Sequence, residues 1–399
     1  MTVRWPWYVT ALLIIAAPLS AQTAVTVDDG QSTGVHQTLT VTTTARSYHV
    51  GTVDVNERVA PFSWQVTSPK FELKIAGQPV QLDAPAEKLR AWTPLTARAD
   101  VLLRVGDTIS VYGRSGSSPL TLDTLAIRAI SAINTSVLDL SSQSLGVPAS
   151  LGVRGIFSFP VGDVVLGLAG ALEQEARPAG LGVTYWQGTT VRGSATINAL
   201  FNERHLAVAF DLSYSNADSL GGRNQFAGGG TAGVNTDFSG ALDDASRWWF
   251  IGNAFYSRPF SNVRNDQPTR LIPSGTFVGL SGSVVTQTGA VTWSPSVQVL
   301  RESSGADVTV LQGTQRTRTS LAASAWSVTS SVSVDIPFWK IFTLTPEVGA
   351  VGGTVSSSLR QSTGRVIGRR GRSVALGSTD AFSDPVRGWW TGIGLSARF

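Results

Sequence analysis

The twelve residues at the carboxyl end, Gly388-Trp-Trp-Thr-Gly-Ile-Gly-Leu-Ser-Ala-Arg-Phe399, decide how the rest of the chain is interpreted. Successive side chains of a β-strand point to opposite faces. The stretch therefore predicts one apolar face, with Trp389, Thr391, Ile393, Leu395, Ala397 and Phe399, and one small or polar face. Its length is close to the roughly 9 to 11 residues of a tilted strand that crosses a bilayer. A strand of a soluble sandwich is the alternative.

The composition favours the membrane alternative. Only 15% of the 399 residues are charged, below the roughly 25% typical of soluble domains. After the first twenty residues, no apolar run approaches the roughly 18 residues of a membrane helix. The chain has no cysteine, which excludes disulfides and thiolate sites. A closed barrel would instead stabilise the fold by pairing every strand with two neighbours.

The amino-terminal residues have the pattern of an export signal. Arg4 precedes a short apolar segment, Val9 to Leu19, and Leu19-Ser20-Ala21 is an acceptable cleavage site. We expect residues 1–21 to be a signal peptide, 22–36 a short periplasmic arm and 37–399 a β-barrel. Removing the signal peptide changes the formal charge from +4 to +3, because it contains one arginine and no acid.

Alternating segments recur along the chain, and the connections between them alternate in length. Short connections are predicted near residues 68, 106, 161, 203, 243, 288 and 338. Long polar connections are predicted at 78–94, 115–149, 175–188, 216–226, 259–273, 302–317 and 357–385. Short periplasmic turns and longer extracellular loops are typical of outer-membrane barrels. The pattern predicts an all-β fold: a transmembrane antiparallel barrel of about 16 strands, with 14 as the alternative and both termini in the periplasm.

Residues 115–149 interrupt the alternation. Apolar residues recur there at helical spacing, at Leu122, Leu125, Ala126, Ala129, Ile130 and Ile133. We expect one short amphipathic helix in a long extracellular loop. It would serve either as loop packing or as a constriction at a channel mouth.

Charged residues on the polar strand faces are the candidate functional residues. A charge on the lipid face costs about 2–4 kcal/mol for Arg or Lys at mid-membrane, so these side chains should point into the lumen. They would set solute selectivity or form ion pairs that support the wall. The predicted lumen-lining residues are Arg98, Asp100, Arg104, Arg114, Arg154, Arg192, Asp211, Asp237, Arg247, Asp335, Glu347 and Arg398.

The sequence contains little that indicates catalysis. Its three histidines, His36, His49 and His205, have no acid or serine singled out beside them, and no spacing predicts a metal pair. We expect no enzymatic activity, no cofactor and no nucleic-acid partner. Five arginines between 360 and 372 make one loop basic, where they would contact lipopolysaccharide phosphates or only solvate the loop.

The closing strand and its terminal Phe399 resemble the terminal strand of bacterial outer-membrane β-barrels, which the barrel assembly machinery recognises. This resemblance implies an assembly signal at Trp389, Ile393, Leu395 and Phe399. More weakly, the architecture resembles outer-membrane transporters of the fatty-acid type, although their Asn-Pro-Ala type plug sequence is missing. These features predict passive transport of small solutes, with hydrophobic compounds among the candidates. A structural or surface-binding barrel with a closed lumen is the alternative.

Overall fold

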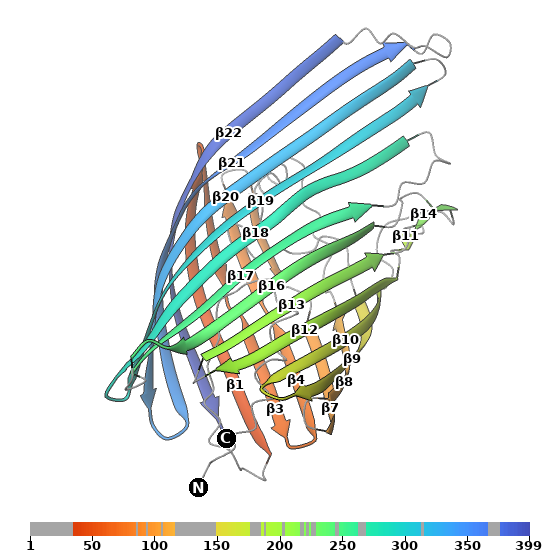
Figure 1. Cartoon of the computed structure of the whole chain (residues 1–399). Helices are drawn as coiled ribbons and strands as arrows, with labels where there is room; N and C mark the ends of the chain where they lie inside the picture. The colour runs from red at the N-terminus through yellow and green to blue at the C-terminus, as the bar shows by residue number, and fades with distance from the viewer. Residues whose placement is uncertain are drawn as a thin grey trace.

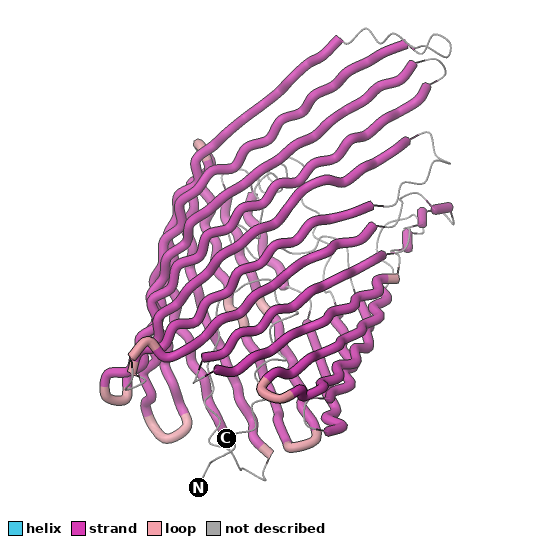
Figure 2. The backbone as a smooth tube through the Cα atoms, viewed as in Figure 1, coloured by secondary structure: helices cyan, strands magenta, loops and turns pink. Residues whose placement is uncertain are grey.

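The computed structural model describes an almost entirely β-stranded chain (Figures 1 and 2). The described residues are 35–84, 87–92, 95–104, 107–115, 149–175, 185–186, 189–201, 204–215, 219–220, 223–224, 229–243, 247–261, 269–312, 315–365 and 376–399. Within this part of the chain, no helix has the length and hydropathy of a membrane span.

The strands of the first half are β1 (His36–Val50), β2 (Val53–Val59), β3 (Phe62–Ser68), β4 (Phe71–Gly77), β5 (Pro79–Ala84), β6 (Glu87–Trp92), β7 (Leu95–Arg104), β8 (Asp107–Ser115), β9 (Ala149–Val161), β10 (Val164–Glu175) and β11 (Tyr185–Trp186). Those of the second half are β12 (Thr190–Phe201), β13 (Arg204–Ser215), β14 (Ser219–Leu220), β15 (Arg223–Asn224), β16 (Gly229–Ala241), β17 (Trp248–Ser261), β18 (Thr269–Thr288), β19 (Val291–Gln312), β20 (Gln315–Phe338), β21 (Phe342–Arg365) and β22 (Leu376–Arg398).

The first and last strands close the barrel. β1 pairs antiparallel with β22 from Thr38 opposite Arg398 to Val50 opposite Val386. The backbones of Gln37 and Phe399 continue this ladder by exchanging two hydrogen bonds, of 2.9 and 3.1 Å. Leu39 lies opposite Ala397 in this ladder, so the terminal strand closes the barrel against the strand that contains Leu39.

The main sheet contains 19 strand segments, but three pairs of them act as single interrupted strands. β2 and β3 both pair with β1 and together form the second strand of the barrel. β5 pairs with β2 and β4 pairs with β3, so β4 and β5 together form the third strand. β6 pairs with β5 and β7 pairs with β4, so β6 and β7 together form the fourth strand. Subtracting three from 19 leaves the predicted 16 strands. β11, β14 and β15 form a separate three-stranded sheet.

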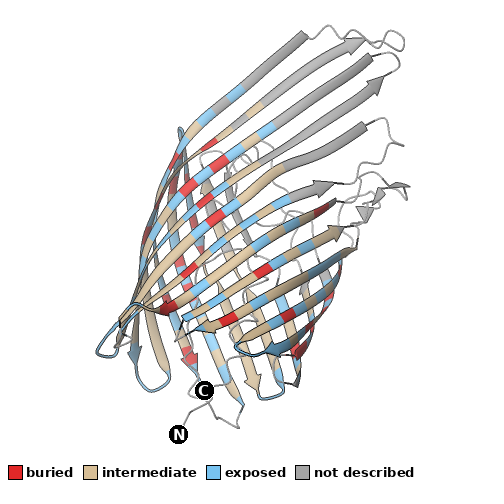
Figure 3. Ribbon diagram, in the orientation of Figure 1, coloured by how far each residue is buried: buried red, intermediate tan, exposed pale blue. Residues whose placement is uncertain are grey.

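Burial alternates along the strands with a period of two, as Figure 3 shows. Side chains on the concave inner face converge and cover one another, whereas those on the convex outer face diverge. The outer face is apolar, with exposed side chains such as Phe157, Leu168, Phe210 and Val299. Trp389, Ile393, Leu395 and Phe399, proposed as the assembly signal, are also exposed on the outside of the closing strand.

One part of the inner face is apolar. Tyr48, Val50, Val55, Leu300, Ala325, Val351, Val355 and Val386 form a buried cluster on β1, β2 and β19 to β22. Phe255, Phe277 and Trp390 pack against it. This inner apolar cluster occupies the wall that β17 to β22 build together with β1 and β2.

The seven predicted short connections all separate paired strands, but four predicted long loops are wrong over most of their length. Residues 79–84 and 87–92 form the β5–β6 hairpin instead of a loop. The predicted loops at 259–273, 302–317 and 357–385 are largely continuations of β17 to β22. Of these segments, 302–317 and 357–385 are rich in Ser, Thr and Gly and carry little of the alternating apolar signal of a membrane strand. Their neighbours nevertheless satisfy their backbone hydrogen bonds.

The resulting barrel is much taller on one side (Figure 1). β20 and β21 have 24 residues each, whereas β12 and β13 have 12 each. At about 3.4 Å per residue, 24 residues extend about 80 Å, far beyond the roughly 9 to 11 residues that cross hydrocarbon. We call the parts of β18 to β22 that extend beyond the length needed to cross the membrane the projecting wall.

Some predictions fall outside the described residues. These are the signal peptide at 1–21, nearly all of the arm at 22–36, and the amphipathic helix, whose six apolar residues lie between 122 and 133.

Candidate functional site

A row of polar and charged residues crosses the inner face of β4, β7, β8, β9, β10 and β12. The strand registers place six residues side by side, each directly opposite the next: Glu72, Asp100, Ser110, Arg154, Ala171 and Arg192. We call this set the charged row. The β7–β8, β8–β9, β9–β10 and β10–β12 registers together align residues from 100 to 192, which are far apart in the sequence.

Two ion pairs stabilise the charged row. Arg98 Nε donates to Asp100 Oδ1 at 2.7 Å, and the two residues are neighbours on the same face of β7. Arg192 Nη2 lies 3.4 Å from Glu173 Oε2 on β10. Asp100 and Glu173 are nearly buried, while the Arg192 side chain is 56% exposed. The row therefore combines anchored carboxylates with at least one guanidinium that solvent reaches.

Arg154 occupies the middle of the charged row. It is only 8% exposed. Asp100 and Asp211 are the carboxylates whose charges act on it, and Arg98 adds a like charge. Directly opposite, on β8, lies the fully buried Ser110.

A second polar group lies on β16 and β17. Asn253 Nδ2 donates to Asn235 Oδ1 at 2.7 Å and to Asp237 Oδ1 at 2.6 Å. Asn235 Nδ2 also donates to Asp237 Oδ2 at 3.3 Å. These hydrogen bonds hold the Asp237 carboxylate against the wall.

The opposite wall carries its own ionic contacts beside the inner apolar cluster. Arg46 Nη1 lies 3.3 Å from Glu57 Oε2, directly across the β1–β2 pair. Trp390 Nε1 donates to Glu347 Oε1 at 3.3 Å. Thr345 Oγ1 donates to Asp335 Oδ1 at 2.7 Å. The predicted residues Asp335 and Glu347 thus lie on β20 and β21, across the barrel sheet from Arg98, Asp100, Arg154 and Arg192.

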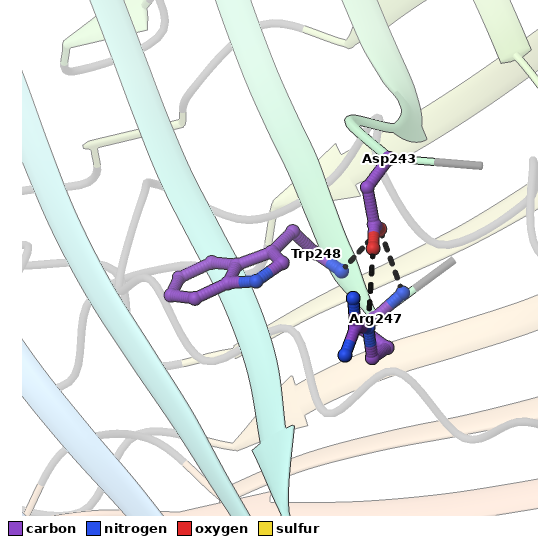
Figure 4. Close-up of polar contacts among 3 residues, drawn as sticks. All are labelled: Asp243, Arg247 and Trp248. Carbon is purple, nitrogen blue, oxygen red and sulfur yellow. Dashed lines mark hydrogen bonds and ion pairs between the residues drawn. The ribbon is translucent and has the colours of Figure 1, made fainter. Parts of the chain in front are cut away.

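Arg247, another predicted residue, lies at the turn between β16 and β17 (Figure 4). Asp243 Oδ1 accepts hydrogen bonds from the backbone N–H groups of Arg247, at 2.8 Å, and Trp248, at 3.0 Å. The Arg247 Nε lies 3.4 Å from Asp243 Oδ2. These contacts, the Trp248 N–H first, hold the pKa of Asp243 below its ordinary value. The Arg247 side chain is mostly exposed and serves the turn.

The remaining predicted residues divide into three groups. Asp211 lies on the inner face of β13. Arg398 is exposed at the end of the closing strand, where its backbone N–H donates to the Ile341 carbonyl oxygen at 2.9 Å. Arg104 and Arg114 end β7 and nearly end β8, but their side chains lie outside the described part of the chain.

Sequence reasoning missed Glu57, Ser110, Glu173, Asn235 and Asn253 as candidate residues. Alternation continued from Val164 along β10 places Glu173 on the inner face, so this residue could have been found from the sequence. Glu57 lies in β2, a short strand with charged residues and little apolar alternation. Among the described residues, no group of His, Asp or Glu could hold a metal ion.

These features define the class of protein. A closed antiparallel barrel satisfies its backbone hydrogen bonds internally, which an open sheet cannot do in hydrocarbon. The barrel has an apolar outer face and a polar, charged inner wall, as transmembrane barrels require. The chain is therefore a closed antiparallel 16-strand β-barrel of the transmembrane type.

Several solved outer-membrane proteins have a similar arrangement of strands. OmpT of Vibrio cholerae is 8% identical, with 92% of this chain and 99% of that chain covered and a TM-score of 0.41. OccK2 of Pseudomonas aeruginosa is 9% identical, with 92% and 98% covered and a TM-score of 0.35. An outer-membrane channel of Pseudomonas putida F1 is 9% identical, with 59% and 92% covered and a TM-score of 0.34. No family model and no curated protein sequence matches the chain.

Proposed function

We propose that the protein is a passive channel that lets small solutes cross the outer membrane through the barrel lumen. The observation that carries this proposal is the charged row on the inner face of a closed 16-strand barrel. Charges on an inner wall interact with solutes that pass along it, and rings of such charges set selectivity in pores.

The dimensions support the proposal. Sixteen strands about 4.8 Å apart, tilted by about 40°, enclose a barrel on the order of 30 Å across. Barrels of 16 to 18 strands typically leave an aqueous channel. Many inner-face side chains of the taller wall are too small to fill such a width: Ser281, Ser283, Ser294, Ser296, Ser331, Ser333, Gly392 and Gly394.

The solutes that fit this lumen best are partly apolar. Phe255, Phe277 and Trp390 are half-buried aromatic side chains at the margin of the inner apolar cluster. A solute with one apolar and one charged portion would find partners for both on the inner wall.

Planar-bilayer recording tests the proposal. Purified barrel, folded in detergent and added to a lipid bilayer in KCl, is expected to give discrete conductance steps. The same preparation denatured by heat is the control and should give none. The absence of openings by folded wild-type protein would contradict passive transport.

The projecting wall favours a second candidate, a barrel that binds partners at the cell surface. Strands of 22 to 24 residues, such as β19 to β21, continue well beyond the bilayer. Deleting the β20–β21 residues beyond the membrane would separate the two candidates. A channel keeps its unit conductance in this variant, whereas a surface-binding barrel loses binding to cells or envelope fractions.

A further inference from the structure

Three arginines point outward from the taller side of the barrel: Arg258 on β17, Arg301 on β19 and Arg387 on β22. Their side chains are exposed, and strand pairing places each of them among residues of the outer face. We call the three the outer arginines. A charge that faces lipid is costly at mid-membrane and costs little near the interfaces. Their level on the barrel therefore decides what they meet.

Strand length places the outer arginines at one edge of the membrane. Arg258 and Arg301 are each the eleventh residue of their strand, and Arg387 is the twelfth residue from the end of β22. All three counts start at the end of the barrel that carries the short connections. A tilted strand crosses the hydrocarbon layer in roughly 9 to 11 residues. The guanidinium groups therefore lie at the level of the lipid headgroups on the side of the projecting wall.

The outer face changes character at the same level. One row of directly paired outward residues crosses β17 to β20: Tyr256, Val278, Arg301 and Trp326. Toward the short connections, the outward residues of β19 and β20 include exposed valines: Val297, Val299, Val328 and Val332. In the other direction, the next outward row of β18 to β22 contains only hydroxyl residues: Thr276, Ser303, Ser324, Ser356 and Ser383. The outer arginines thus lie where an apolar band gives way to hydroxyl groups.

An exposed aromatic ring accompanies each outer arginine. Trp326 lies directly opposite one of them, and Tyr256 and Trp389 lie two residues from the others on the same strand face. Trp and Tyr are enriched where a membrane meets water, because one part of the ring is apolar and the other forms hydrogen bonds. The rings therefore support the same assignment of level as the strand lengths.

The outer arginines have no carboxylate partner in the part of the chain that the structure describes. Glu302 and Asp384, which are close to two of them in the sequence, lie on the inner face. Asp54 is exposed on β2 and contacts His49, the residue opposite Arg387 on β1. Three positive charges at headgroup level are thus left for a group outside the chain.

We propose that the outer arginines bind the anionic phosphate groups of lipid headgroups in the leaflet beside the projecting wall. A guanidinium presents parallel N–H donors that match the oxygens of a phosphate. The row of hydroxyl groups supplies further hydrogen-bond partners for the headgroup. Acyl chains of the same lipid would cover the apolar band, which brings its phosphate groups to the level of the arginines. The inference goes beyond the proposed channel function and does not depend on it.

Lipid titration of the full-length barrel, folded in a nonionic detergent, tests the inference. A ligand that binds the native state raises the midpoint of thermal unfolding in a saturable way. The probes are diphosphoryl lipid A, phosphatidylcholine and inorganic phosphate at equal concentrations. The midpoint of the wild type is expected to rise with lipid A and to change much less with the other two. Replacing Arg258, Arg301 and Arg387 together by Gln should raise the apparent Kd for lipid A at least about tenfold, since each basic residue near a membrane surface adds to the attraction of anionic lipid.

The matched control replaces Arg204, Arg247 and Arg398 by Gln, which removes three arginines from the opposite end of the barrel and should leave the lipid A response unchanged. Equal apparent Kd values for the wild type and the outer-arginine variant would overturn the inference. A response to phosphatidylcholine or inorganic phosphate as large as that to lipid A would also overturn it. If the Gln variant does not fold, replacement of the outer arginines by Lys decides, because Lys keeps the charge and loses the paired donors. An unchanged Kd in that variant would then overturn the inference.

Discussion

The indole ring of Trp390 lies against the backbone of Gly349, so a Cβ added to Gly349 would come within 2.0 Å of the ring. The two residues are direct partners in the β21–β22 ladder. The indole N–H also donates to Glu347 on the same face. A glycine on one strand thus leaves the space that a large aromatic side chain occupies from the next, beside the seam where β22 meets β1.

Gly349→Val should destabilise the barrel by about 1–3 kcal/mol, because a larger side chain there forces the indole ring out of its position. The measurement is the midpoint of thermal unfolding, followed by the gel mobility of the folded barrel. Gly352→Val is the matched control: it makes the same substitution in β21, where an added Cβ meets nothing within 4 Å. Equal midpoints for both variants would contradict the packing role of Gly349.

Arg192→Ser should make the channel more cation-selective, since Arg192 is the exposed positive charge of the charged row. A unit charge about 7 Å from a permeating ion contributes about 0.6 kcal/mol in water, with opposite sign for potassium and chloride. The two effects add to about 1.2 kcal/mol, or about an eightfold change in the potassium-to-chloride permeability ratio. Reversal potentials in a KCl gradient measure this ratio. Arg258→Ser is the control, because Arg258 is exposed on the outer face of β17. An unchanged reversal potential in Arg192→Ser would show that Arg192 does not set ion selectivity and only forms the ion pair with Glu173.

The Asp243 carboxylate should make the β16–β17 turn sensitive to acid. Its pKa is lowered in the folded protein by the N–H groups of Trp248 and Arg247. The stabilisation is therefore complete above the ordinary aspartate pKa of about 3.9, and it is lost as the pH falls through the lower folded value. The amide protons of Arg247 and Trp248 should exchange faster in acid, after correction for intrinsic rates. In Asp243→Ala they should exchange fast at every pH; slow exchange there would show that other groups hold the turn.

Phe399→Asp should lower the amount of folded barrel in the outer membrane of cells while changing refolding in detergent much less. The Phe399 side chain is exposed on the outer face and free to be recognised, whereas its backbone pairs with Gln37. Any residue at this position can form those backbone hydrogen bonds. Quantifying the heat-modifiable band from membranes and from refolded protein tests both statements. Wild-type levels in membranes would contradict the assembly role of this residue.

Several features could be predicted from the sequence because their causes are local. Lipid outside and water inside impose alternation on each membrane-crossing strand, so the closing strand, the short turns and the count of 16 follow from apolar residues at every second position. Arg98, Asp100, Arg154 and Arg192 could be assigned to polar faces for the same reason. Lipid imposes no such pattern on the projecting wall, so the sequence predicts loops where the structure has strands.

Only the tertiary structure decided which polar residues meet. Ser110 and Arg154 are separated by 44 positions, the difference of their residue numbers, and nothing in the intervening sequence fixes the β8–β9 register that places them opposite each other. A shift of two residues would preserve every alternation and yet pair Arg154 with another side chain. The sequence by itself determined that this chain builds a barrel with charges on its inner wall. The strand registers decided that Arg154 lies directly opposite the buried Ser110, because register depends on the summed pairing and packing of the closed sheet.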